Sequence, residues 1–340
     1  MRQLIALALA CAATLSACEK SAETGPSSDA AQASPYAATV RDIEEAMAAY
    51  HFNPSLLASS EYRAAQAELV EVAAGAASDD AFLEGFAEIW SDGPFSHVSL
   101  SKAQGTALET SQYLDTMTVG PDAVSLSWTD KTAILTVTTM MGVDTIAYIE
   151  DAYEEVVARE ADRLIIDLRE NGGGAFAIVP LIEHVLTEPY EAGGFASRKW
   201  AAAHARAPRP GEFLETEPWT GWSIQTFWAD ATAVPLTRVR FEPRELTFDG
   251  PVIVLTSSKT ASAAELAADA LRGSGRARLV GEETAGEMLS QKLYDVAGGF
   301  HLAIPIADYF ANHTGRIEGA GVRPDTPAPA AEALDAAMAL

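Results

Sequence analysis

Apolar residues recur at helical spacing over the first third of the chain. Ile43, Met47 and Tyr50 follow one another three or four residues apart, and similar spacings continue toward residue 90. This period is typical of amphipathic helices that bury one face. The acidic pair at 79–80 is placed to cap the last of these helices. We therefore predict a helical subdomain over residues 37–95.

Beyond residue 130 the pattern changes, and short buried-type apolar runs alternate with helical segments. The runs are rich in β-branched and aliphatic residues, as expected of strands. The predicted elements are a strand at 133–137, a helix at 146–159, a strand at 164–168, a helix at 178–186, a strand at 252–255 and a helix at 261–271. Alternation of strands and helices predicts an α/β core.

This core is predicted to span residues 96–330, and an Ala-rich C-terminal helix follows at 331–340. The segment 190–247 interrupts the alternation with many Trp, Pro and Arg residues. Two interpretations stay open for it: an insertion on the substrate side, or an elaborated surface.

The N-terminal residues have the pattern of an export signal. A basic start is followed by an apolar run at 4–15, which is too short to span a bilayer permanently, and then by small residues. The four residues ending at Cys18 read LSAC and resemble a bacterial lipobox. We predict a signal peptide over 1–17, lipidation of Cys18 and a flexible polar tether over 18–36. The alternative is an ordinary signal with an incidental cysteine.

Cysteine content and charge limit the possible partners. Cys11 lies in the predicted signal, so lipidation of Cys18 leaves the mature chain without a thiol for a disulfide. Acyl chains would hold the body at a membrane surface. Because Glu19 follows the cysteine instead of the aspartate that retains lipoproteins in the inner membrane, we expect the outer membrane, facing the periplasm. The net charge of −25 argues against a nucleic acid partner.

Four short segments contain the kinds of groups that catalyse acyl transfer. They read FSHVSL at 95–100, DLRENGGG at 167–174, TSSKTASAAE at 256–265 and RIEGAGVRPD at 316–325. Ser262 lies between a strand and a helix, where the helix dipole and open N–H groups favour a developing negative charge. On the local pattern alone, however, helix capping by Ser262 or Thr260 is the stronger interpretation. A neutral His97 is the usual kind of base for a serine, although a lone histidine is more often structural.

Taken together and in this order, the segments resemble the tail-specific or C-terminal processing peptidases, and more closely their tricorn-core-like branch. DLRENGGG is similar to that family's glycine motif, TASAAELAADALRGSGRARLVGEETAG to its nucleophile block and IEGAGVRPD to its closing motif. The resemblance extends from about residue 90 to 330. It implies an α/β core of the Clp protease/crotonase-like fold, here preceded by the helical subdomain.

The resemblance also implies a role for each matching residue. Ser262 would be the nucleophile, and Gly172 or Gly173 would form the oxyanion hole with the N–H of Ala263. In the tricorn-like branch a Ser-His pair lies upstream and a glutamate lies near the closing motif. These places are occupied by Ser96, His97 and Glu318, so that His97 would be the base and the other two would orient it. No metal or cofactor is implied.

Two departures from the family pattern change what is expected. The processing branch carries its catalytic lysine where this chain has Glu287, so a serine–lysine pair is excluded at that position. Gln291 falls where that branch has a glutamine, whose role without the lysine stays open. Only about 35 residues separate His97 from the predicted strand at 133, too few for the PDZ module that usually precedes the core.

The expected function is hydrolysis of peptide bonds in exported peptides or unfolded proteins by an acyl-enzyme mechanism. The alternative is a non-catalytic lipoprotein of the same fold that binds a ligand such as a retinoid-type lipid, since fold does not determine function. A third interpretation is a scaffold of the cell envelope. Convergence of Ser96, His97, Ser262 and Glu318 would favour the enzyme, because a pure binder has no need of all four.

Overall fold

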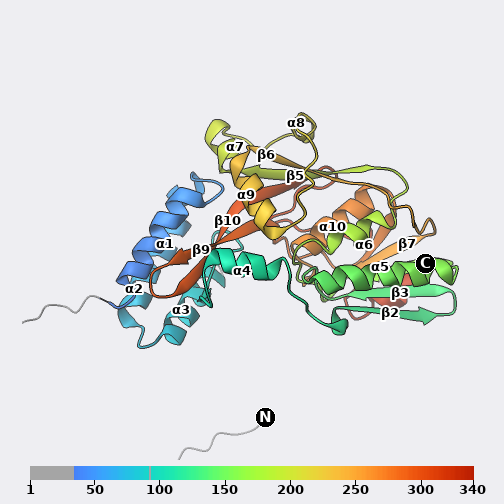
Figure 1. The fold of residues 1–340 in the computed structure, drawn as a ribbon, viewed down its shortest axis with the longest axis horizontal. Helices are drawn as coiled ribbons and strands as arrows, with labels where there is room; N and C mark the ends of the chain where they lie inside the picture. The colour runs from blue at the N-terminus through green and yellow to red at the C-terminus, as the bar shows by residue number, and fades with distance from the viewer. Residues whose placement is uncertain (1–33, 92) are drawn as a thin grey trace, which may run out of the picture. The chain divides into compact units, whose positions relative to one another are not determined.

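A computed structural model describes residues 34–91 and 93–340 (Figure 1). The predicted signal at 1–17, Cys18 and most of the tether at 18–36 lie outside the described residues. The helices are α1 (Ala37–Tyr50), α2 (Ser60–Gly75), α3 (Asp79–Ser91), α4 (Ala107–Leu114), α5 (Val143–Ala158), α6 (Ile178–Glu183), α7 (Arg198–Ala203), α8 (Pro210–Phe213), α9 (Ile224–Ala233), α10 (Ala263–Gly273) and α11 (Ala333–Met338). The strands are β1 (Ser99–Lys102), β2 (Val124–Thr129), β3 (Thr132–Val137), β4 (Arg163–Asp167), β5 (Tyr190–Ser197), β6 (Leu236–Phe241), β7 (Val252–Thr256), β8 (Ala277–Gly281), β9 (Leu289–Val296), β10 (Phe300–Ala311), β11 (Gly315–Arg316) and β12 (Thr326–Pro327).

One sheet has the order β12-β8-β7-β4-β3-β2, and all its neighbours are parallel except the β3–β2 pair at the edge. Strands β3, β4 and β7 coincide with the three predicted strands to within one residue. Every residue of β7 is buried, as expected of a central parallel strand that is covered on both faces. The predicted α/β fold class is therefore confirmed.

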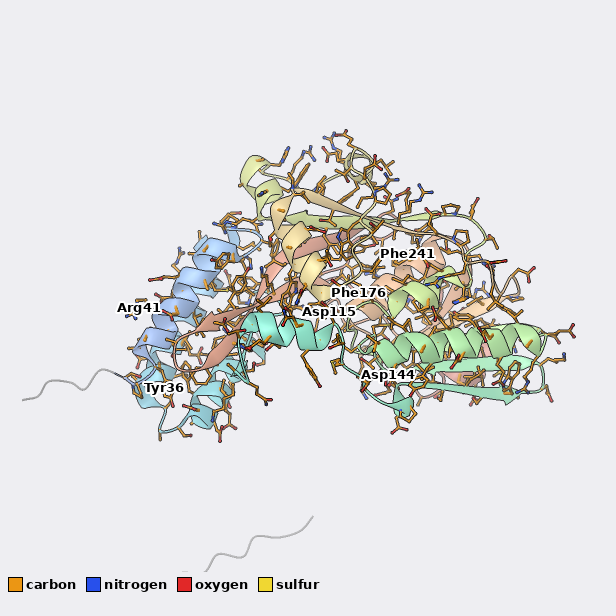
Figure 2. The ribbon with its side chains drawn as sticks, in the orientation of Figure 1. Tyr36, Arg41, Asp115, Asp144, Phe176 and Phe241 are labelled. Atoms are coloured by element: carbon orange, nitrogen blue, oxygen red, sulfur yellow. The ribbon has the colours of Figure 1, made fainter. Side chains whose placement is uncertain are left out.

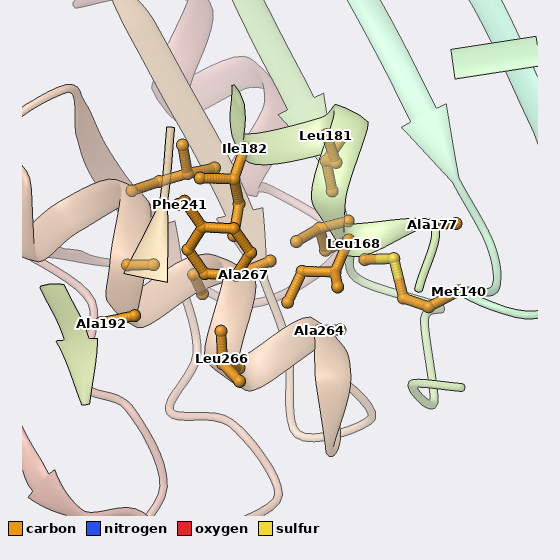
Figure 3. Close-up of a cluster of buried hydrophobic side chains, with 14 of the residues drawn as sticks. Met140, Leu168, Ala177, Leu181, Ile182, Ala192, Phe241, Ala264, Leu266 and Ala267 are labelled. Carbon is orange, nitrogen blue, oxygen red and sulfur yellow. The ribbon is translucent and has the colours of Figure 1, made fainter. Parts of the chain in front are cut away.

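Side chains alternate between the two faces of this sheet. One face of the strands packs under α5, α6 and α10 in the largest apolar cluster. On the other face, Ile165, Ile253 and Val280 pack against Ala333 and Ala337 of α11, which lies within the predicted C-terminal helix. Figure 3 shows Ala264 and Ala267 of α10 in the buried cluster that also holds Leu181 and Ile182 of α6. The small alanines allow α10 to approach closely, and this packing positions the residue that precedes the helix.

A second sheet, which is antiparallel, has the order β1-β10-β5-β6, with β9 and β11 also paired to β10. Strand β10 is 12 residues long and pairs with each of these strands except β6. It thereby connects the N-terminal helices with the region around β5.

Helices α1 to α3 bury their apolar faces together with the β9–β10 hairpin, and α1 lies beside that hairpin in Figure 1. The ring of Phe82 stacks on Tyr36 with centroids 4.3 Å apart and lies 5.9 Å from Phe300. The predicted cap at 79–80 is wrong by one residue: Ser78 Oγ accepts the N–H of Ala81. The two aspartates lie in the first turn of α3, where their charge still favours the helix dipole.

The segment 190–247 forms β5, α7, α8, α9 and β6. Several of its large side chains, among them Phe195, Phe227 and Phe241, belong to the main apolar cluster, so the segment contributes to the core. Within residues 34–91 and 93–340, no helix combines the length and apolar character needed to cross a bilayer.

Candidate active site

Ser262 occupies a strained backbone position at the junction between β7 and α10. Its φ is 55° and its ψ is −122°, and it immediately precedes the first residue of α10. A non-glycine residue in such a conformation costs about 1–3 kcal/mol and persists only where its surroundings determine it. The residues around Ser262 must therefore hold its backbone in this conformation.

The side chain of Ser262 does not cap the helix. Within the described chain its hydroxyl makes no hydrogen bond, whereas its N–H donates to Glu265 Oε2 at 3.0 Å. The hydroxyl of Thr260, the other capping candidate, donates to the carbonyl of Leu168 at 2.8 Å and accepts the N–H of Ser257 at 3.0 Å. The capping interpretation therefore fails for both residues, and the Ser262 hydroxyl is uncommitted.

Glu265 is fully buried and accepts four hydrogen bonds. In addition to Ser262, the donors are the hydroxyl of Thr284 and the N–H groups of Gly286 and Glu287, the latter two at 2.8 and 2.9 Å. Burial raises the pKa of Glu265, and the four donors oppose this by stabilising the carboxylate. The carboxylate thus joins the backbone of the candidate nucleophile to the loop at 284–287.

Glu265 is not among the site residues predicted from the sequence. The signal was present as a glutamate three residues after a serine at a helix start, which is the capping-box pattern. Here the glutamate's half of that motif is formed by its side chain, whereas the N–H of Glu265 donates to the backbone carbonyl of Ser262 at 2.9 Å.

The glycine loop, residues 171–174, follows β4 and approaches Ser262. It does so because β4 and β7 are adjacent parallel strands, whose carboxyl ends share one edge of the sheet. Gly173 has a φ of 93°, and a Cβ there would lie 2.6 Å from the Cβ of Ser262. Buried Asn171 fixes the loop: its Nδ2 donates to the carbonyl of Val137 and its Oδ1 accepts the N–H of Gly173 at 2.8 Å. Only a glycine fits at position 173.

The three N–H groups predicted for the oxyanion hole differ in availability. That of Gly173 is engaged by Asn171. Those of Gly172, an exposed residue, and of Ala263, the first residue of α10, have no acceptor in the part of the chain that the structure describes. These two are available to an oxyanion beside Ser262.

His97 lies between α3 and β1 with a φ of 62°. Its Nδ1 is 2.6 Å from Ser96 Oγ, and the N–H of Ser96 donates to Glu318 Oε1 at 3.3 Å. Glu318 is 9% exposed, and its other oxygen accepts the N–H groups of Met288 and Leu289 at 2.7 and 3.2 Å. Burial lowers the pKa of His97, and the charge of Glu318 opposes that shift. The lowered pKa favours the neutral imidazole.

A cavity of about 590 Å³ brings the candidate residues together. His97, Gly172, Gly173, Ser262 and Ala263 all line it. Ser96 and Glu318 do not line it but connect to His97 in the chain of hydrogen bonds described above.

Gln291 and Glu287 differ in their relation to this cavity. Gln291 lines it, whereas Glu287 is exposed and is not part of its wall. No lysine is found among the residues that line it. Among the described residues, no cluster of His, Cys, Asp and Glu is arranged to hold a metal ion.

A sequence model of peptidase family S41 matches residues 131–328, which include β4, the glycine loop, Ser262 and Glu318. The chain belongs to peptidase family S41. The matched segment includes the parallel strands of the first sheet and Ser262, whereas β2 and His97 lie before it.

Curated relatives of this S41 chain include carboxyl-terminal-processing enzymes. The chain is 36% identical over 128 residues to the carboxyl-terminal-processing protease of Picosynechococcus sp., a match that covers 35% of this chain and 30% of that protein. It is 25% identical over 181 residues to the chloroplastic carboxyl-terminal-processing peptidase 2 of Arabidopsis thaliana, covering 53% and 29% of the two chains. The matches therefore span less than a third of these relatives.

Solved structures show the likeness of the fold over more of the chain. The photosystem II D1 C-terminal processing protease aligns with a TM-score of 0.51 and 16% identity, over 86% of this chain and 92% of that one. A lipoprotein from Streptococcus agalactiae aligns with a TM-score of 0.57 and 13% identity, over 88% and 94%.

We expect the substitution Glu265→Gln to lower the free energy of unfolding by about 1–3 kcal/mol for each donor left without an acceptor. Thr284 can reverse its hydroxyl to accept from the new amide, but the N–H of Gly286 cannot be reversed. Urea unfolding measures the loss, with the exposed Glu283→Gln as the matched control. Equal stability of the two variants would show that the carboxylate does not hold the loop.

Proposed function

We propose that this protein is a serine peptidase that hydrolyses peptide bonds through an acyl-enzyme on Ser262, with His97 as the general base. The observation that carries the proposal is the uncommitted hydroxyl of Ser262 at the N-terminus of α10, in a cavity that His97 also lines. A hydroxyl without a structural bond, in the same cavity as an imidazole whose pKa is lowered, provides the two groups that nucleophilic acyl transfer requires.

In the proposed reaction, Ser262 Oγ attacks the carbonyl carbon of the scissile bond while His97 Nε2 takes its proton. This needs the tautomer in which Nδ1–H donates to Ser96 Oγ, a contact of 2.6 Å that leaves the Nε2 lone pair free. The N–H groups of Gly172 and Ala263 stabilise the oxyanion. His97 then gives its proton to the leaving amine, and a water activated by the same imidazole hydrolyses the ester.

Glu318 and Ser96 act as positioning residues in this scheme. The N–H of Ser96 is held by Glu318, and the Ser96 hydroxyl holds the imidazole. The negative charge of Glu318 also favours the imidazolium that forms during attack, which is the role of a third group in a catalytic triad.

We propose peptides or unfolded proteins outside the cytoplasm as the substrates. Support comes from the family and from the relatives named as carboxyl-terminal-processing enzymes. The net charge of −25 disfavours nucleic acid as a partner. A purely ligand-binding lipoprotein would have no use for an unbonded serine in the same cavity as a supported histidine, so the binding alternative is less well supported.

The choice of base is tested by two substitutions. We expect His97→Ala to lower kcat/KM on a peptide substrate by roughly 10²–10⁴-fold, the usual contribution of a general base. Glu287→Gln is the matched control and should retain most of the activity, because Glu287 is exposed and outside the cavity. Loss of activity in Glu287→Gln together with full activity in His97→Ala would mean that the base is misassigned.

We further propose that the mature protein begins at a lipidated Cys18 and is anchored in the outer membrane, facing the periplasm. The lipobox-like residues before Cys18 and the Glu19 that follows it support this proposal. Wild-type protein should partition into the detergent phase, whereas Cys18→Ala should be recovered as unprocessed precursor or in the aqueous phase. Unchanged fractionation and processing of the variant would contradict lipidation.

A further inference from the structure

We propose that the aromatic part of the active-site cavity is the pocket for the side chain of the residue whose carbonyl is attacked, and that it selects a bulky apolar residue there. In the usual nomenclature for proteases, the residue whose carbonyl is attacked is P1 and its pocket is S1. The preferred P1 residues are large apolar ones such as Phe and Leu. The proposal rests on the peptidase function and adds to it the class of bond that is cleaved.

The pocket is built from aromatic rings that are brought together from distant segments. Trp219 lies 5.0 Å from Trp222 and 5.3 Å from Phe227, measured between ring centroids. Phe176, which follows the glycine loop, lies 5.8 Å from each of the two tryptophans, and Phe241 of β6 stacks on Trp222 at 5.7 Å. Figure 2 marks Phe176 and Phe241, which come from segments far apart in the sequence.

The rings of Phe176, Trp219, Trp222, Phe227 and Phe241 form an aromatic wall of the cavity. This wall begins at the groups that would hold the scissile carbonyl. Ala263, whose N–H is available to the oxyanion, and Leu266 lie three residues apart on α10, hence on one face of the helix, and both line the cavity. On the other side, the lining passes from Gly172 to Phe176. A carbonyl held between Gly172 and Ala263 therefore places the side chain of its own residue at the entrance of the aromatic wall.

The charges around the cavity decide what can enter. None of the residues that line it is Asp, Glu, Lys or Arg, and its one titratable group is His97, the proposed base. A charged side chain would lose its hydration without gaining a partner, which is strongly unfavourable. An apolar ring would instead bury its surface against other rings. The cavity volume of about 590 Å³ leaves room for a large side chain.

The wall is also fixed in place before a substrate binds. The indole N–H of Trp219 donates to Asp230 at 2.9 Å, which sets the plane of the ring. The carboxylate of Asp115, which follows α4, accepts the N–H groups of Ile224 and Gln225 at 2.5 and 3.1 Å and so anchors the start of α9. Helix α9 carries Phe227 into the pocket. A pre-organised pocket loses little entropy on binding and therefore discriminates well between side chains.

The test uses one peptide sequence in which only P1 is varied among Phe, Leu, Ala, Asp and Lys, and a second set in which only P1′ is varied. We expect kcat/KM for Phe or Leu at P1 to exceed that for Ala by roughly 10²-fold, since each buried methylene contributes substantially to discrimination. Asp and Lys at P1 should be cleaved more slowly than Ala.

A substitution then links the preference to the pocket. Trp222→Ala should lower the Phe-to-Ala ratio at P1 about tenfold, since it removes a ring in contact with three others. Trp128→Ala is the matched control, because Trp128 lies on β2, outside the cavity, and packs on Arg159. It should leave the ratio unchanged.

Each result bears on the proposal. Equal rates for Ala and Phe at P1, or selectivity only at P1′, would overturn the pocket assignment and leave the peptidase function standing. A preference for Phe that Trp222→Ala does not reduce would place the selecting groups elsewhere and also overturn it. Failure to cleave any peptide of either set would overturn the proposed function, and the pocket assignment with it.

Discussion

The site depends on one buried carboxylate. Glu265 collects the N–H of Ser262, two N–H groups of the loop at 284–287 and the hydroxyl of Thr284, and it is fully buried. This single group holds Ser262 at a positive φ without using its hydroxyl. Because the side chain of Glu265 holds the backbone of Ser262, the serine is positioned while its hydroxyl stays free to react. A serine whose hydroxyl capped its own helix would not be free in this way.

The two sheets then supply the remaining groups. In the parallel sheet, the neighbouring strands β4 and β7 end at the same edge, so the glycine loop meets the start of α10. The segment that carries His97 leads into β1 on the antiparallel sheet, and Glu318 follows β11 of the same sheet. The N–H groups of Ser96, Met288 and Leu289 donate to the carboxylate of Glu318 and so join these pieces on the base side of the cavity.

Much of the fold could be predicted from periodicity, since β3, β4 and β7 are continuous apolar runs in the sequence. Ser262 was indicated as the nucleophile only by the resemblance of four ordered segments to a known family, because the strand-to-helix junction alone favoured a capping role. The role of Glu265 could not be separated from ordinary capping, because the pattern is the same and only the direction of the serine side chain distinguishes them. The aromatic pocket was not foreseen either: Trp219 and Trp222 follow no period, and they meet Phe176 and Phe241 only through tertiary packing. Nor could the spacing of residues in the sequence reveal that the Asn171 side chain accepts a hydrogen bond from the N–H of Gly173, which makes that N–H unavailable to an oxyanion.

The most direct test is the pH dependence of labelling by a fluorophosphonate, with the modified residue located by mass spectrometry. Burial lowers the pKa of His97 below its ordinary value of 6.5, and only the neutral imidazole can accept the Ser262 proton. We therefore predict labelling at Ser262 alone, at a rate that is constant near neutral pH and falls as the pH drops through a midpoint below 6.5. In His97→Ala, labelling should be slow and should lack that midpoint. Labelling at another residue, or an unchanged rate and midpoint in His97→Ala, would contradict the account.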